Sequence, residues 1–296
     1  MRWKGREQSK NVIDNRGKRG AVAAGGGLGL IGIIIAVVFT LMRGGDAGDA
    51  LKTAVTQAAK QAAQSQAVSG ARDATTSEAD QEMREFVAVV LKDTEDVWSR
   101  LLPEMGIRYR APKLVMFSDR TPSACGSATS AVGPFYCPGD NQVYLDTVFF
   151  NELQTRFNAP GDFACAYVIA HEVGHHIQNL MGKSMEVQSQ QARLSKKEGN
   201  RLSVRLELQA DFLAGVWAHH AQKMKQILDP GDIEEALVAA QAIGDDTLMR
   251  NAGAAVRPDS FTHGTSEQRI YWFKRGLSRG DLREINLPFE IAYDQL

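Results

Sequence analysis

Apolar residues recur at helical spacing over most of the chain beyond residue 82. One such stretch covers 82–102 and stops at Pro103, because proline cannot continue a helix. The same spacing predicts later helices at 147–157, 162–181, 184–198, 200–226, 232–243 and 265–277. Short apolar runs at 113–118, 135–137 and 142–146 are typical of strands. A few strands followed by many helices predict an α+β fold, mostly helical with a small antiparallel sheet.

An uncharged stretch of 22 residues at 21–42 is long enough for one transmembrane helix. Residues 1–20 before it hold seven basic and two acidic residues. This charge bias predicts a single-pass protein of the bacterial inner membrane with a cytoplasmic N-terminus. A cleaved signal peptide is the alternative, but the apolar run is longer than such peptides need, and Arg43 follows it without a small-residue cleavage pattern.

The composition changes again after the apolar stretch. Residues 43–80 are rich in Ala, Gln, Ser, Thr and Gly and contain neither aromatic residues nor proline. Such a segment buries too little apolar surface to order itself, so 43–81 is expected to be a flexible tether. The periplasmic or extracellular domain is then 82–296.

The whole chain of 296 residues has 44% hydrophobic residues and a net charge of −1. This apolar content suits a globular core and excludes a wholly disordered chain. A dedicated nucleic-acid-binding protein usually has a basic excess, and none is present here, so no nucleic-acid partner is expected.

The chain contains three cysteines. Cys125 and Cys137 flank a loop rich in Gly and Ser within the segment expected to be exported, so a disulfide between them is predicted. Cys165 is then unpaired. Its position on a helix fits a small core residue better than a zinc ligand.

The strongest chemical signal is His171-Glu172-Val173-Gly174-His175, an H-E-x-x-H pattern inside the predicted helix 162–181. Residues i and i+4 leave one face of a helix, so both imidazoles can reach one zinc ion. The adjacent Glu172 can act as a general base toward a water molecule. Gln178 and Met181 replace the glycine and the last histidine of the longer metzincin pattern, which excludes that class.

A catalytic zinc site needs a third protein ligand, and Glu207 is the candidate. It lies in the predicted helix 200–226, one turn before Asp211, and the surrounding residues are almost all apolar. Two unpaired carboxylates would be costly to bury in such a helix. Glu207 is therefore expected to bind the metal, and Asp211 to accept a hydrogen bond from a ligating histidine.

The remaining histidines carry weaker signals. His176 is five residues from His171 and points off the ligand face, and His219 and His220 lie more than two turns beyond Asp211. His263 stands in the loop before the last predicted helix. It could stabilise an oxyanion in the active site, or its loop could simply cap the helix through Thr265 or Ser266.

With these motifs in view, the chain resembles the YpfJ-type family of neutral zinc metallopeptidases. The resemblance rests on MRWKGREQS at the start, SACGSATSAVGPFYCPGDNQVYLD at 123–146, FACAYVIAHEVGHHIQ at 163–178, RLELQAD at 205–211 and FTHGTSEQRIYWFKRG at 261–276. It implies a membrane-anchored zincin with His171, His175 and Glu207 on one zinc ion and Glu172 as general base. Phe212 stands where the family pattern often has a cysteine, so no role tied to that cysteine is expected here.

The sequence thus predicts a membrane-anchored zinc metallopeptidase that acts on a protein or peptide substrate in the cell envelope. The strand at 142–146 is the candidate edge strand that pairs with the substrate. Two alternatives stay open: a non-catalytic, zinc-stabilised scaffold for envelope partners, and a zinc amidase that acts on cell-wall peptides. An intact Glu172 favours an enzyme, because a scaffold needs metal ligands but no general base.

Overall fold

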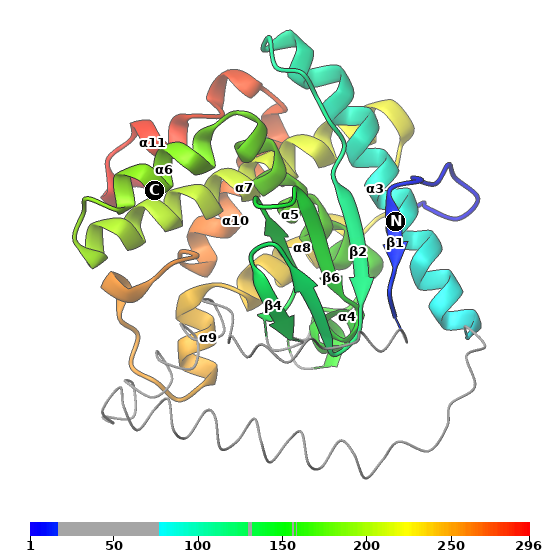
Figure 1. The fold of residues 1–296 in the computed structure, drawn as a ribbon, viewed down its shortest axis with the longest axis horizontal. Coiled ribbons are helices and arrows are strands. Elements are labelled where there is room, and N and C mark those ends of the chain that lie inside the picture. The colour runs from blue at the N-terminus through cyan, green and yellow to red at the C-terminus, as the bar shows by residue number, and fades with distance from the viewer. Residues whose placement is uncertain (17–76, 130–131, 156, 158) are drawn as a thin grey trace.

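A computed structural model describes residues 1–16, 77–129, 132–155, 157 and 159–296, and the fold of these residues is α+β and mostly helical (Figure 1). The α-helices are α3 (Glu78–Glu104), α4 (Thr147–Thr155), α5 (Asp162–Leu180), α6 (Lys183–Gln191), α7 (Lys196–Lys225), α8 (Asp232–Ala242), α9 (Asp245–Asn251), α10 (Ser266–Arg279) and α11 (Leu287–Glu290). The strands are β1 (Val12–Asp14), β2 (Lys113–Phe117), β3 (Arg120–Ser123), β4 (Gly126–Thr129), β5 (Phe135–Cys137) and β6 (Gln142–Asp146).

The main sheet is mixed, which corrects the expected antiparallel sheet. Its order is β1-β2-β6-β5, with β1, β2 and β6 parallel and β5 antiparallel to β6. Strands β3 and β4 form a separate antiparallel hairpin. The physical reason lies in burial: residues 114–117 and 143–146 are all buried, as parallel strands covered on both faces require. Because β6 pairs on both sides, it is not an edge strand, and the substrate-pairing role expected for 142–146 is wrong.

The first sixteen residues pack against the domain, although they were expected to belong to a separate basic segment. Their strand β1 pairs with β2, and Trp3 packs edge-on against Phe86 of α3. The predicted anchor at 21–42 and most of the predicted tether lie outside the described residues. Within the described ranges, no helix combines the length and the apolar character that a membrane span requires.

Helix α5 lies at the centre of the fold, between α7, α8, α3 and the sheet (Figure 1). Most of its residues are buried, and the turn residues Gly161 and Gly182 bound it. Helix α7 begins with a capping box formed by Ser195 and Glu198, which satisfies two free N–H groups at its first turn.

Helices α7 and α10 cross at backbone contact. A Cβ on Gly215 would lie 2.1 Å from the carbonyl oxygen of Phe273, and a Cβ on Gly276 would lie 2.1 Å from that of Phe212. Only glycine permits this approach at both positions. The crossing fixes α10, and the loop before it, against the helix that carries Glu207 and Asp211.

The predicted disulfide between Cys125 and Cys137 is confirmed, and it ties the β3–β4 hairpin to β5. Cys165 is a free thiol on α5, partly buried and packed against the hydrophobic core. Burial raises its pKa well above the usual range, which fits an unreactive core position.

Candidate metal centre

The structure brings His171, His175 and Glu207 together between α5 and α7. His171 Nε2 lies 3.2 Å from Glu207 Oε2, and His175 Nε2 lies 3.5 Å from Glu207 Oε1. One ligand atom from each of the three residues lies within 4.8 Å of the others. Glu207 lies 32 positions after His175 in the sequence, and the packing of α7 on α5 brings the two residues together.

These donors fit zinc, because two imidazole nitrogens and a carboxylate are a common catalytic ligand set. Both Nε2 atoms face the same carboxylate, while both Nδ1 atoms are engaged elsewhere. The Nε2 lone pairs are therefore the ones aimed at a shared metal position.

The electrostatics of the site couple the three residues. Burial opposes protonation of His171, but the charge and hydrogen bond of Asp211 and the hydrogen bond of Glu207 together outweigh it and raise the pKa of His171 to about 9. Burial also opposes protonation of His175, and Glu207 outweighs it, so the pKa of His175 is raised as well. Burial favours the neutral form of Glu207, yet His175 and His171 hold its pKa well below the usual range. The centre thus concentrates negative charge that a cation would satisfy.

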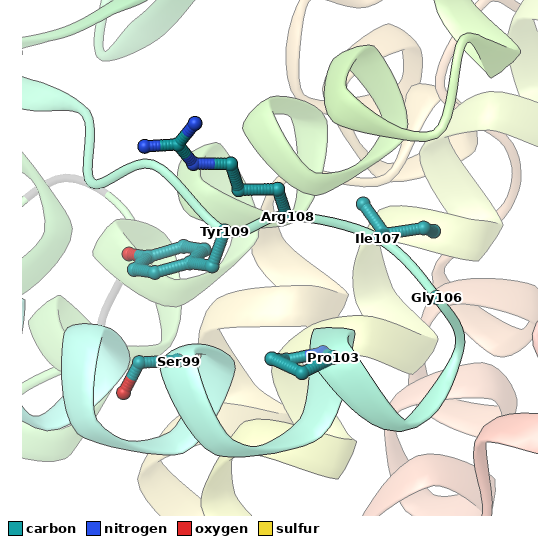
Figure 2. A pocket seen from close by; sticks show the side chains of 6 residues that line it. All are labelled: Ser99, Pro103, Gly106, Ile107, Arg108 and Tyr109. Carbon is teal, nitrogen blue, oxygen red and sulfur yellow. The ribbon is translucent and has the colours of Figure 1, made fainter.

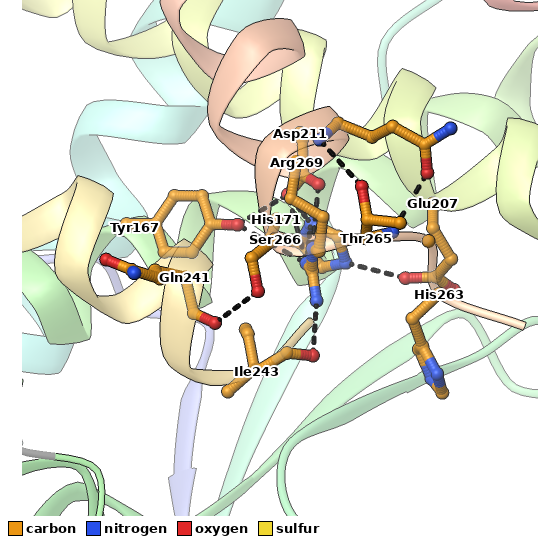
Figure 3. Close-up of polar contacts among 12 residues, drawn as sticks. Tyr167, His171, Glu207, Asp211, Gln241, Ile243, His263, Thr265, Ser266 and Arg269 are labelled. Carbon is orange, nitrogen blue, oxygen red and sulfur yellow. Dashed lines mark hydrogen bonds and ion pairs between the residues drawn. The ribbon is translucent and has the colours of Figure 1, made fainter. Parts of the chain in front are cut away.

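Asp211 occupies the position expected of it beside His171. His171 Nδ1 donates to Asp211 Oδ1 at 2.8 Å, and the Tyr167 hydroxyl donates to the same oxygen at 2.5 Å (Figure 3). The buried guanidinium of Arg269 lies against the other side of the carboxylate. Burial would raise the pKa of Asp211, but Arg269 and His171 lower it to about 2, so this carboxylate stays ionised.

His175 has an orienting partner that sequence reasoning missed. Its Nδ1 donates to Gln178 Oε1 at 2.9 Å, and the Gln178 amide donates to the Leu206 carbonyl at 2.6 Å and to Gln209 Oε1 at 3.1 Å. The signal was the spacing, since a residue three positions after His175 lies on the same helix face. The glutamine that excludes the metzincin pattern therefore fixes the ring of the second histidine.

Glu172 follows His171 on α5 and is 8% exposed. Its charge also contributes to the raised pKa of His175, which places the carboxylate near the ligand cluster. It is thus located where a general base next to a metal position would be needed.

His263 lies in the loop before α10, on the side of Glu207 (Figure 3). Its Nδ1 donates to Asp245 Oδ1 at 3.2 Å, while Asp245 Oδ2 accepts from the N–H groups of Thr262, His263 and Gly264. Partial desolvation opposes the charged form of this ring, whose side chain is 47% exposed, but Asp245 and Glu207 raise its pKa. Thr265 is the N-cap of α10, so the same loop both caps the helix and brings His263 beside the centre.

The other histidines form hydrogen bonds that link segments of the fold. His176 Nε2 donates to the Arg110 carbonyl and its Nδ1 accepts from the Tyr136 hydroxyl, away from the ligand face. His219 and His220 donate to the carbonyls of Leu277 and Gly280 at the far end of α7. None of these three belongs to the ligand group in the described part of the chain.

Two further features lie apart from this centre. Asp162, Asp232 and Glu235 form a carboxylate group, and the amino group of Met1 lies 2.5 Å from Asp162 and 3.2 Å from Asp232. A shallow surface hollow of about 490 Å³ lies at the end of α3 (Figure 2). None of its lining residues is a predicted site residue. The lining consists of Ser99, Pro103, Gly106, Ile107, Arg108 and Tyr109.

Comparison with known proteins agrees with the chemistry of this centre. The family model described as "Putative neutral zinc metallopeptidase" matches residues 1–287. The chain belongs to this family. It is 44% identical to the Escherichia coli K12 protein YpfJ over 97% of this chain and 98% of that protein. It is also 44% identical to the Mycobacterium tuberculosis protein Rv2575 over 62% of this chain and 64% of that one. No solved structure matches.

Membership of the family supports zinc and hydrolase chemistry at the coarse level. The named relatives are themselves uncharacterized proteins, so they add no substrate. The individual roles of His171, Glu172, His175, Glu207 and His263 rest on the geometry above and stay predictions.

Proposed function

We propose that this protein is a zincin-like, zinc-dependent peptidase whose centre consists of His171, His175 and Glu207. The observation that carries the proposal is the convergence of two Nε2 atoms on one carboxylate, with Glu172 adjacent. Zinc held by such a set supplies Lewis acidity toward a water molecule and a substrate carbonyl.

Around that ion the chain provides the groups for peptide hydrolysis. Glu172 takes the proton of the attacking water and delivers it to the leaving amine. His263, held by Asp245, donates a hydrogen bond to the carbonyl oxygen as negative charge develops there. Its raised pKa favours the protonated ring that such donation needs.

Strand β5 replaces β6 as the candidate for substrate pairing. It is an edge strand of the described sheet, and its Tyr136 hydroxyl contacts His176 and Asn179 of α5. An extended peptide added to β5 would therefore run beside the helix that carries the ligands. If 21–42 spans the membrane as the sequence predicts, the domain is exported and its substrates are cell-envelope proteins or peptides.

The test is zinc content and cleavage of an unfolded protein such as casein, for the full chain and three variants. Glu172→Gln should retain one zinc per chain and lose cleavage by at least about 100-fold. Glu207→Ala should lose zinc. Glu234→Gln, which changes an exposed glutamate on α8, is the matched control and should behave as wild type.

Three results would contradict the proposal. Cleavage by Glu172→Gln at the wild-type rate would remove Glu172 from the mechanism. A zinc-loaded wild type that cleaves no peptide would favour the scaffold. A wild type that cleaves only the amide bonds of purified cell-wall muropeptides would favour the amidase.

A further inference from the structure

The buried guanidinium of Arg269 has no role in the function proposed above, although it lies against the metal centre. Arg269 comes from α10 and is 2% exposed. Its Nε donates to Asp211 Oδ2 at 2.9 Å and its Nη2 donates to Asp211 Oδ1 at 3.0 Å (Figure 3). This two-pronged contact fixes both the position and the rotation of the carboxylate.

The orientation of that carboxylate determines the orientation of His171. Asp211 Oδ1 accepts from His171 Nδ1, from Tyr167 and from Arg269 at once. A rotation of the carboxylate would therefore move the oxygen that holds the imidazole. The opposite ring nitrogen, Nε2, would then no longer face Glu207.

We propose that Arg269 is a positioning residue of the metal centre, which holds Asp211 so that His171 presents Nε2 to the metal. This inference rests on the proposed function only in assuming that a metal binds there. A lysine at 269 would keep the positive charge but could not donate from two fixed nitrogens to both oxygens of Asp211. Arg269→Lys therefore separates the effect of positioning from the effect of charge.

The test is zinc affinity, measured by competition with a chromophoric chelator on the metal-free full chain without any substrate. Arg269→Lys and Asp211→Asn should each weaken zinc binding by about 10- to 100-fold. The double variant should bind no more weakly than Asp211→Asn alone, because Arg269 acts through Asp211. Arg275→Lys on the same helix, where the arginine pairs with Glu284, is the control and should leave zinc affinity unchanged.

If Arg269→Lys does not fold, Asp211→Asn is compared with Asp211→Asn/Arg269→Met, in which no buried charge is left unpaired. Equal zinc affinity of these two supports the proposal, and a further tenfold loss overturns it. The proposal is also overturned if Arg269→Lys has a lower Tm than wild type but binds zinc with an affinity within twofold of wild type. Wild-type protein that binds no zinc would instead overturn the metal centre itself.

A second inference concerns the N-terminal segment and has independent support. Strand β1 pairs with β2 in parallel register, and the flanking backbone adds hydrogen bonds from Leu114 to Asn11 and from Asn15 to Met116. Strand β1 thus forms one edge of the four-stranded sheet.

Side chains of this segment are also part of the domain. Arg6 pairs with Asp93 of α3, which is 1% exposed, and the Ser9 hydroxyl donates to Glu95 at 2.6 Å. Trp3 is 9% exposed and packs on Phe86. These contacts require direct access of residues 1–16 to the surface of the domain.

We infer that residues 1–16 and the domain from residue 77 onward lie on the same side of any membrane with which the protein associates. The sequence instead predicts a single span at 21–42, outside the described residues, with the two parts on opposite sides. The two arrangements exclude each other.

Labelling of one introduced cysteine at a time with a membrane-impermeant maleimide decides between them. The full chain is expressed in cells in a Cys165→Ser background, and that background without an added cysteine is the blank for Cys125 and Cys137. Lys10→Cys reports on the N-terminal segment and Lys196→Cys on the domain, and both positions are exposed. Both cysteines labelled in intact cells, or both labelled only after permeabilisation, support the inference. One labelled and one protected in intact cells overturns it.

Discussion

The crossing of α7 and α10 offers a quantitative test of how the fold positions the centre. In Gly215→Ala the new methyl group would lie 2.1 Å from the Phe273 carbonyl oxygen and 2.6 Å from the Leu277 nitrogen. Both atoms belong to the backbone, so no side-chain rotation can relieve the clash. The helices must separate instead.

The expected magnitude follows from two opposing effects. Overpacking costs about 1–3 kcal/mol, and the upper end applies because rigid backbone is displaced. Alanine is favoured over glycine inside a helix by about 1 kcal/mol. The free energy of unfolding should therefore fall by about 2 kcal/mol, which corresponds to a Tm lower by about 4–8 °C.

Chemical and thermal denaturation of the purified protein measure this change. Gly199→Ala is the matched control in the same helix, because its Cβ would meet nothing closer than Gln191 Cγ at 3.8 Å. The control should be neutral or stabilising by up to about 1 kcal/mol. If Gly215→Ala were as stable as Gly199→Ala, backbone contact between α7 and α10 would not be what holds α10 in place.

Four further predictions concern the site and its surroundings. Loss of the disulfide in Cys125→Ser/Cys137→Ser should lower the free energy of unfolding by about 3 kcal/mol in denaturant titrations, and equal stability would contradict this. Gln178→Leu should weaken zinc binding by about 10-fold in chelator competition, because His175 loses its orienting acceptor; unchanged affinity would refute the role of Gln178. Zinc must displace the proton of His171, whose pKa is about 9, so affinity should rise with pH up to that value, and a flat profile between pH 7 and 9 would refute it. In the metal-free protein the same shift gives stability that is complete below about pH 6.5 and is lost as pH rises through about 9.

The sequence predicted the elements whose signals are local. Helix α5 was placed within one residue, because an apolar pattern and a glycine mark its C-terminal end. Glu207 and Asp211 were predicted as site residues because two acidic residues one turn apart stand among apolar positions of one helix. The disulfide was found because its two cysteines flank one short loop.

What the sequence did not predict depends on contacts between distant segments. The parallel pairing of β2 with β6 and the addition of β1 both join segments far apart in the chain, and the Val-Ile-Asp run of β1 carries almost no strand signal. Gly215 and Gly276 look like ordinary helix-weakening residues until the two helices are seen to touch. The spacing of Gln178 from His175 is visible in the sequence. Its role as an orienting partner also depends on its hydrogen bond to the Leu206 carbonyl on another helix, which the sequence does not show.

Arg269 shows why buried charge is the hardest part of such a site to predict. In the sequence it lies within Ser-Glu-Gln-Arg at the start of an amphipathic helix, where an arginine normally faces solvent. Its burial is possible only because Asp211, 58 residues earlier, supplies the opposite charge. Asp211 in turn was predicted from the cost of burying an unpaired carboxylate. A hydrogen bond from a histidine N–H offsets only part of that cost. A carboxylate that stays ionised in the core needs a full counter-charge, so a buried acidic residue of this kind predicts a buried cation on a neighbouring helix.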